Sequence, residues 1–194
     1  MSSIVSYNHE VDPYTRPSFP LRNKLLRVIW GIVYNLLFKL SPRPFHEWRS
    51  FLLRCFGARV GRKCRIYPLA KIWAPWNLIC EDVVVVADEA IIYNPSPIHL
   101  CSHSTISQQA YLCGASHDFD GPDFKLISKP IYIEAYVWVC ARSTVLMGLT
   151  LEEGSILGLG SIATKNLESW SVYVGIPAKK VKQRCNFLFS INSK

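Results

Sequence analysis

The sequence has no Cys-x-x-Cys pair, few charged residues and no apolar run of the length that crosses a bilayer. Its 7 cysteines are scattered and odd in number, which argues against a zinc ribbon or a disulfide scaffold and favours a reducing compartment. Charged residues make up 19% of the chain and hydrophobic residues 49%, which excludes a disordered protein. The start of the chain lacks the apolar core of a signal peptide, so we expect one cytoplasmic domain of 194 residues.

Acidic residues are also scarce, with 14 against 22 basic ones and a net charge of +8. The imbalance is uneven along the chain. Residues 1–65 hold 12 basic and 3 acidic residues, residues 66–168 hold 5 and 11, and residues 169–194 hold 5 and none. A nucleic-acid-binding domain normally carries its basic patch on the folded scaffold, so an acidic middle argues against a nucleic-acid partner.

The N-terminal part of the chain is a polar arm followed by an apolar segment. We expect a flexible arm over residues 1–20 and helices over residues 21–57, because apolar residues from Leu21 onward recur at helical spacing among basic residues. Two interpretations stay open. The helices pack on the main domain or on a neighbouring subunit, or residues 21–56 lie on the inner face of an anionic membrane. The anchors in the second case are Trp30, Tyr34 and Trp48.

Between residues 58 and 178 aliphatic residues recur in runs at every sixth position, a period that fits neither a helix nor a simple strand. It fits a three-sided solenoid in which each step of six residues supplies one short strand and one turn, so that three steps close a coil of about 18 residues. The most regular run is Ile133, Val139, Val145, Leu151, Leu157 and Ala163. The less regular run is Val60, Ile66, Ile72, Leu78, Val86, Ile92, Ile98, Leu100, Ile106 and Leu112. Small or aliphatic residues follow four positions later in the regular run: Val137, Ser143, Leu149, Ser155, Ser161 and Leu167.

The period fails over residues 113–132, which predicts an excursion loop at one corner of the solenoid. His117 stands at the base of this loop, where a coil ends and a cleft can form. Residues 179–194 follow the repeat as a basic C-terminal tail.

The hexapeptide repeat is typical of left-handed parallel β-helix proteins, and the sequences around it resemble the maltose and galactoside O-acetyltransferase group. The matching stretches are Ser116-His-Asp-Phe, Lys129-Pro-Ile-Tyr-Ile, Tyr136-Val-Trp-Val, Gly148-Leu-Thr-Leu, Gly158-Leu-Gly-Ser-Ile-Ala-Thr-Lys165 and Gly175-Ile-Pro-Ala-Lys179. Within the group the chain is most similar to colanic acid biosynthesis acetyltransferases. The resemblance implies a mainly β fold with an N-terminal helical segment, a homotrimer with sites between subunits, and acetyl-CoA as donor without a metal.

The resemblance also implies a mechanism and an acceptor. His117 would act as general base and take the proton of a sugar hydroxyl while the oxygen attacks the acetyl-CoA thioester, a task suited to an imidazole near neutral pH. The acceptor would be a sugar or a lipid-linked glycan in exopolysaccharide assembly. The substrate side of the cleft would include Asn94 and Tyr111, and Asp118 would orient the imidazole or be a solvated loop carboxylate.

The donor residues carried over from the group are Trp138 in the cleft, Ala141 along the pantetheine channel, and the pair Thr164 and Lys165 near the nucleotide. Lys179 and Lys182 take positions usually held by arginine and would bind phosphate with less bidentate geometry. The group's Gly-Ala-Gly is Gly-Leu-Gly here, so we expect Leu159 to narrow the channel.

Two other functions compete with acetyl transfer. Some left-handed β-helices are carbonic anhydrases with a zinc bound by three histidines, but position 122, where that class has a further histidine, is proline. His99 and His103 offer no third ligand beside His117 in the expected place. The other alternative is a non-catalytic trimeric scaffold or binding protein.

Overall fold

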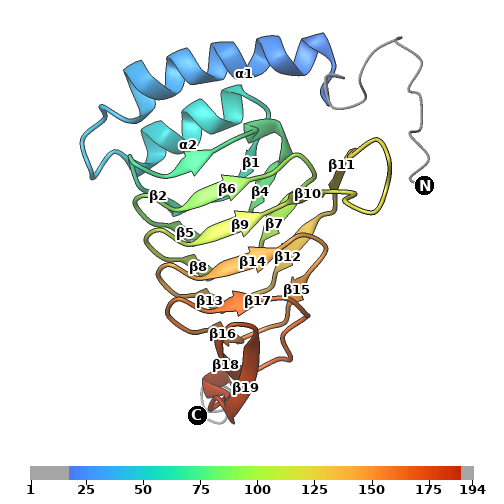
Figure 1. Ribbon diagram of the computed structural model, residues 1–194. Coiled ribbons are helices and arrows are strands. Elements are labelled where there is room, and N and C mark those ends of the chain that lie inside the picture. The colour runs from blue at the N-terminus through green and yellow to red at the C-terminus, as the bar shows by residue number, and fades with distance from the viewer. Residues whose placement is uncertain (1–17, 189–194) are drawn as a thin grey trace, which may run out of the picture.

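The computed structural model describes residues 18–188, and they form a three-sided parallel β-helix with helices at its N-terminal end (Figure 1). Two α-helices, α1 (Leu21–Val33) and α2 (His46–Cys55), flank a π-helical turn over Tyr34–Phe38. A 3₁₀ turn covers Pro75–Asn77. Residues 1–17 of the expected arm and 189–194 of the expected tail lie outside the described part of the chain.

Three parallel sheets form the sides of the prism, and consecutive strands visit them in turn. Sheet A contains β1 (Arg59–Val60), β4 (Leu78–Cys80), β7 (Ile98–Leu100), β12 (Ile131–Ile133) and β15 (Thr150–Leu151). Sheet B contains β2 (Arg65–Ile66), β5 (Val85–Val86), β8 (Thr105–Ile106), β13 (Trp138–Val139), β16 (Ile156–Leu157), β18 (Ser171–Gly175) and the antiparallel β19 (Ala178–Gln183). Sheet C contains β3 (Lys71–Ile72), β6 (Ile91–Tyr93), β9 (Tyr111–Cys113), β14 (Thr144–Leu146) and β17 (Ile162–Ala163). We name the corners AB, BC and CA after the sheets that they join.

The aliphatic residues of the six-residue repeat fill the core, as the sequence predicts. Every member of both runs is buried, from Val60 at 9% exposed to Leu157 at 0%. The less regular run has a structural cause. Val60, Cys80 and Leu100 share one register position, so the first coils take 20 residues, whereas Ile133 and Leu151 are 18 apart. Three-residue strands in sheet A then bury two side chains each, as Ile98 and Leu100 do.

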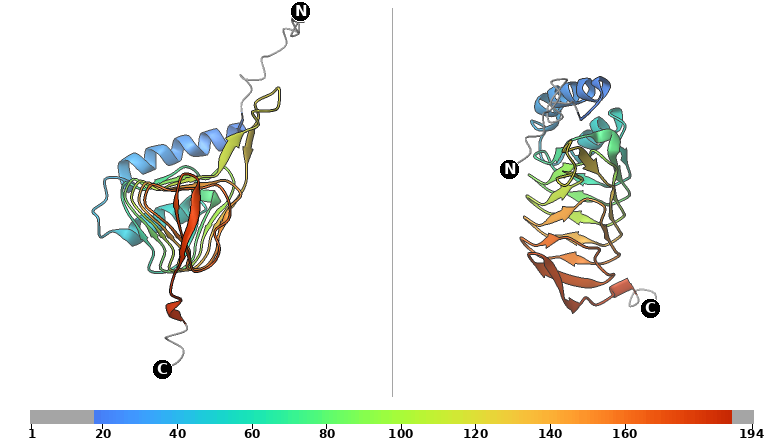
Figure 2. Two further views of the ribbon diagram at one scale, coloured as in Figure 1. Left: turned by 60° about the horizontal axis from the view of Figure 1, so that its bottom comes forward. Right: turned by 45° about the vertical axis from the view of Figure 1, so that its right-hand side comes forward.

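The predicted excursion loop is a β-hairpin. It consists of two antiparallel strands, β10 (Ala115–His117) and β11 (Leu126–Ser128), and it connects β9 to β12 along the chain. Figures 1 and 2 show it projecting from the CA corner, beside the N-terminal end of α1. The predicted basic tail begins differently from our expectation, because residues 179–183 belong to β19 and extend sheet B.

Side chains of the helices cap the open end of the prism. The first strand of each sheet would otherwise expose carbonyl groups at its edge, which invites pairing with another chain. Arg54 Nε donates to the Val60 carbonyl at 2.9 Å, Arg49 Nε to Ile66 at 2.6 Å, and Trp30 Nε1 to Ile72 at 2.7 Å. These three carbonyls are six residues apart, so the cap follows the period of the repeat.

Candidate active site

His117 lies at the end of β10, where it pairs with Leu126 across the hairpin. Its Nδ1 lies 2.8 Å from the backbone carbonyl oxygen of Phe124, and its ring stacks on the Phe124 ring with 4.4 Å between centroids and 9° between planes. Phe124 ends a turn that begins at Gly121, and its φ of +44° is uncommon for a bulky residue. The hairpin thus holds the imidazole by one hydrogen bond and one ring face.

This hydrogen bond determines which nitrogen of the imidazole can act as a base. A carbonyl oxygen can only accept, so Nδ1 carries the proton in the bond to Phe124. In the neutral imidazole Nε2 then keeps its lone pair, which is the form that a general base needs. His117 is partly exposed, so a ligand can reach it.

The contact with Phe124 is the part of the site that the sequence analysis missed. A backbone carbonyl carries no residue-specific signal, and the Gly121-Pro122 turn was the one local hint. Of the two roles left open for Asp118, the structure favours the solvated loop carboxylate over orientation of the imidazole. The Asp118 carboxylate instead accepts a hydrogen bond from the Gly121 backbone at 3.2 Å, and so closes the loop.

The predicted donor residues lie mainly on sheet B and on the BC corner, away from the hairpin. Trp138 is on β13, 46% exposed, and its indole nitrogen donates to Ser107 Oγ at 2.8 Å. Ala141 and Leu159 are in stacked turns of the BC corner, where the Gly160 backbone donates to the Ala141 carbonyl at 3.0 Å. Leu159 is 72% exposed and therefore projects from the prism.

Two lysines extend this surface toward the C-terminal end of the prism. Lys179 and Lys182 are exposed on β19, opposite Val174 and Val172 of β18. Val172 continues the row of outward side chains that contains Trp138, because β18 pairs with β16 and β16 with β13. Lys180 is tied to Glu168 at 2.6 Å.

Thr164 and Lys165 lie apart from the other donor residues. They follow β17 at the CA corner, where both are exposed. This is the corner that carries the hairpin and His117, so the predicted site residues divide between the CA corner and the side of the prism formed by sheet B and the BC corner.

The two predicted acceptor residues differ in their surroundings. The expectation that Asn94 lies in the cleft is wrong, because its side chain is fully buried. Its amide bonds to both the N–H and the carbonyl of Ala74, at 2.9 and 2.8 Å. It therefore joins two coils. Tyr111 is half-buried on the outer face of β9, and burial together with a hydrogen bond to Cys113 raises the pKa of its phenol. Of the two, Tyr111 remains on a surface that a substrate can contact.

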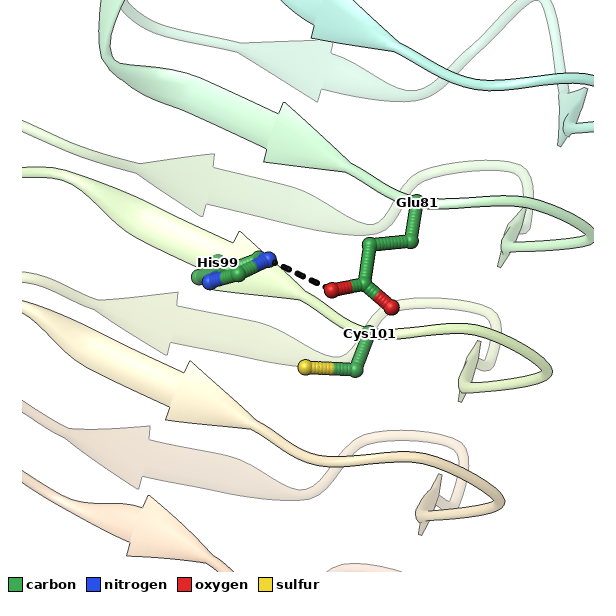
Figure 3. Close-up of side chains that lie close together, drawn as sticks. All are labelled: Glu81, His99 and Cys101. Atoms are coloured by element: carbon green, nitrogen blue, oxygen red, sulfur yellow. Dashed lines mark hydrogen bonds and ion pairs between the residues drawn. The ribbon is translucent and has the colours of Figure 1, made fainter.

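A second cluster of polar groups lies on sheet A. Glu81, His99 and Cys101 point toward one another (Figure 3), and their potential ligand atoms lie within 4.8 Å of one another. His99 Nε2 is 3.1 Å from Glu81 Oε1. The other oxygen of Glu81 accepts from the backbone N–H and the hydroxyl of Ser102 at 2.9 and 3.0 Å, and these bonds lower the pKa of Glu81.

We interpret this cluster as structural, because the bond from a backbone N–H of the next coil to a glutamate carboxylate recurs along the AB corner. Glu134 and Glu152 likewise accept from the backbone of the next coil, at Glu153 and Ser169. Burial and the nearby carboxylates raise the pKa of Cys101 to about 11, so its thiol keeps its proton at neutral pH.

The histidines that the carbonic anhydrase alternative needs do not converge in the described part of the chain. His99 is on sheet A beside Glu81, His103 stacks on Tyr136 at 4.8 Å at the AB corner, and His117 is on the hairpin. This arrangement does not support a three-histidine zinc site.

No family model matches the chain. A relative of Escherichia coli K12, named colanic acid biosynthesis acetyltransferase WcaF, is 36% identical over 156 residues, which are 80% of this chain and 86% of the relative. The chain belongs to this family. It is therefore an acetyltransferase, as the resemblance implies.

Solved structures of low sequence identity agree with the fold of this acetyltransferase. A hexapeptide-repeat acetyltransferase of Vibrio cholerae, complexed with acetyl coenzyme A, has a TM-score of 0.78 at 20% identity and covers 88% of this chain and 93% of that one. A maltose O-acetyltransferase of Clostridium difficile has a TM-score of 0.78 at 19% identity, covering 86% and 90%. The predicted hexapeptide-repeat β-helix is confirmed. Among the described residues, no helix combines the length and apolar character needed to cross a bilayer.

Proposed function

We propose that this protein transfers an acetyl group from acetyl-CoA to a hydroxyl group of a sugar, with His117 as general base. The observation that carries the proposal is the hydrogen bond from His117 Nδ1 to the Phe124 carbonyl, which leaves Nε2 as the basic nitrogen. The membership in an acetyltransferase family supplies the reaction class.

The reaction needs no covalent enzyme intermediate. Nε2 of His117 takes the hydroxyl proton as the sugar oxygen attacks the carbonyl carbon of the thioester. The bond between this carbon and sulfur then breaks, and the CoA thiolate accepts the proton from the imidazolium. The cysteines have no part in these steps, which agrees with the raised pKa values of the buried Cys80 and Cys140 thiols.

We propose a homotrimer as the active form, because the proposed site residues of one chain lie on two separate sides of the prism. His117, Thr164 and Lys165 are at the CA corner, whereas Trp138 and Lys182 belong to sheet B. A neighbouring subunit that brings its sheet B to the CA corner would join the two groups in one cleft. The Vibrio cholerae neighbour that binds acetyl coenzyme A supports the choice of donor, and the lysines of β19 supply charge for its phosphates.

The acceptor that we propose is a sugar or a lipid-linked glycan in exopolysaccharide assembly. The support comes from the name of the Escherichia coli relative, which places that protein in colanic acid biosynthesis. Tyr111, exposed in part on the outer face of sheet C, is the acceptor-side residue retained from the sequence analysis.

The test measures the release of CoA from acetyl-CoA by detection of the free thiol, with a panel of sugars and sugar nucleotides as acceptors. We expect at least one acceptor to accelerate release, and His117→Ala to lower kcat by about 10²–10⁴. His99→Ala, on sheet A, is the matched control and should retain the rate. Equal release by wild type and His117→Ala with every acceptor would contradict the proposal and favour the scaffold alternative.

A further inference from the structure

Helix α1 carries two apolar faces, and only one of them packs on the β-helix. On the inner face, Trp30 is 4% exposed and bonded to the Ile72 carbonyl, and the Tyr34 and Phe38 rings pack around it. The expectation that Trp30 and Tyr34 are membrane anchors is therefore wrong, because both side chains pack against the prism. The outer face consists of Leu21, Leu25, Val28, Ile29, Ile32 and Leu36, which are between 43% and 81% exposed.

The outer face is one continuous stripe. At the helical rotation of about 100° per residue, its six side chains fall within an arc of about 100°. Arg22 and Lys24 lie on either border of this arc, and Trp30 lies opposite it. Leu36, Leu37 and Leu40 continue the stripe into a groove of about 470 Å³ that they line together with Phe45 and Trp48.

Helix α2 enlarges this apolar surface. Phe45, Trp48 and Phe51 are 53%, 39% and 52% exposed, and the rings of Trp48 and Phe51 stack at 5.8 Å. Trp48 is also fixed to the end of the π-helical turn, because its indole nitrogen donates to the Leu37 carbonyl at 3.0 Å. An apolar surface of this extent on a monomer marks an interaction site.

The charge of this end of the molecule indicates the partner. Between residues 18 and 65 the chain has one acidic residue, Glu47, and 11 basic ones. Glu47 lies 3.8 Å from Arg54, so its charge is countered locally. Two copies of such a surface would bring like charges together, which opposes self-association through it. Anionic lipid headgroups offer the complementary charge, and their acyl region takes the apolar stripe.

We infer that the helical cap, residues 21–55, docks on the surface of an anionic bilayer. Helix α1 lies in the plane of the interface with its outer stripe inserted, while Arg22, Lys24 and Lys39 meet the headgroups. The prism then extends away from the membrane, since α1 covers its N-terminal end (Figure 1). This inference is independent of the proposed acetyl transfer.

The test is flotation of the full-length protein with vesicles of phosphatidylcholine plus phosphatidylglycerol, compared with phosphatidylcholine alone. We expect binding to the anionic vesicles at low salt, at least about tenfold weaker binding to the neutral ones, and release at high salt. The variant Leu25→Ser/Ile29→Ser/Ile32→Ser should bind the anionic vesicles at least about tenfold more weakly, because three aliphatic side chains no longer enter the bilayer.

The matched control is Val174→Ser/Val181→Ser, which removes exposed aliphatic groups at the opposite end of the prism. It should bind the vesicles like wild type, as should His117→Ala, which separates this test from that of the proposed function. Melting temperatures verify that each variant folds. The inference is overturned if wild type does not float at low salt, or if the triple variant floats equally well. It is also overturned if the triple variant dissociates into smaller species in sedimentation, which would assign the stripe to a second copy of the chain.

Discussion

The backbone carbonyl of Phe124 holds the imidazole of His117 through Nδ1 at 2.8 Å, and the Phe124 ring covers one face of that imidazole. Both contacts come from one residue with a positive φ, at the end of a turn inside the hairpin. Strained backbone of this kind persists where the surroundings require it, often at functional sites. The pair links the fold of the excursion loop to the proposed chemistry.

Replacement of Phe124 separates orientation of the base from binding. Phe124→Ala keeps the carbonyl but loses the ring that covers the imidazole, so we expect kcat to fall by about tenfold with little change in the KM for acetyl-CoA. Phe124→Tyr should stay near wild type. Steady-state kinetics check both variants, and nitrogen NMR of the imidazole should show the Nδ1-protonated tautomer in both, because both keep the carbonyl. A changed KM at constant kcat would contradict the orienting role.

Two leucines of the same strand and turn give opposite predictions. Leu157 is fully buried and Leu159 is 72% exposed. Leu157→Ala opens a cavity in the narrow core and should cost about 2–5 kcal/mol of unfolding free energy. Leu159→Ala should leave stability within about 0.5 kcal/mol and lower the KM for acetyl-CoA, since it widens the proposed donor channel. Denaturant unfolding and kinetics with acetyl-CoA test the pair, and an unchanged KM would remove Leu159 from the channel.

Two glycines with similar backbones differ in the space around them. Gly154 and Gly160 have φ values of +68° and +63°, so alanine at either position costs about 1 kcal/mol of strain. A Cβ at Gly154 would lie 2.5 Å from the Trp170 ring, whereas at Gly160 it would meet nothing within 4 Å. We expect Gly154→Ala to lose about 1–3 kcal/mol more than Gly160→Ala in denaturant unfolding. Equal losses would show that Trp170 moves freely.

The cap of the prism depends on a buried arginine. Arg49 is 0% exposed and donates to the Ile66 carbonyl, to Ser41 Oγ and to the Pro42 carbonyl at 2.6–2.8 Å. Arg49→Met leaves these acceptors without their donor, at a cost of about 3 kcal/mol, which lowers Tm by about 6–12 °C. The exposed Arg59→Met is the control and should melt like wild type in calorimetry. Retained stability in Arg49→Met would mean that water replaces the guanidinium.

Acid sensitivity should include a contribution from Glu81. The bonds from Ser102 lower its folded-state pKa, so its stabilisation is present above its ordinary pKa and is lost as the pH falls through the folded-state value. Glu81→Gln should lower the unfolding free energy by about 1 kcal/mol or less at pH 7, because the carboxylate is partly exposed to solvent. The loss should be smaller still in acid. Unfolding of wild type and Glu81→Gln at a series of pH values checks this, and an equal loss of unfolding free energy at every pH would contradict it.

Some of the site could be predicted from the sequence, and the rest could not. His117 was found because the failure of a period of six marks a loop, and the Ser-His-Asp motif marks its chemistry. Asn94 looked like a cleft residue because a polar side chain at a corner gives the same local signal whether it faces solvent or another coil. Its bonds to Ala74, 20 residues away, follow from coil stacking.

The sequence by itself determined the prism, because each coil contacts only its neighbours and a repeated aliphatic residue is enough to fill so narrow a core. It also determined the position of the excursion and the basic character of both ends. Only the tertiary structure decided that Phe124 rather than Asp118 holds His117, that most of the proposed donor residues lie on another side of the prism from His117, and that α1 keeps its outer stripe free of the prism. These are relations between segments with no shared period, so distances across a hairpin or between sheets determine them, and these distances exist only once the chain has folded.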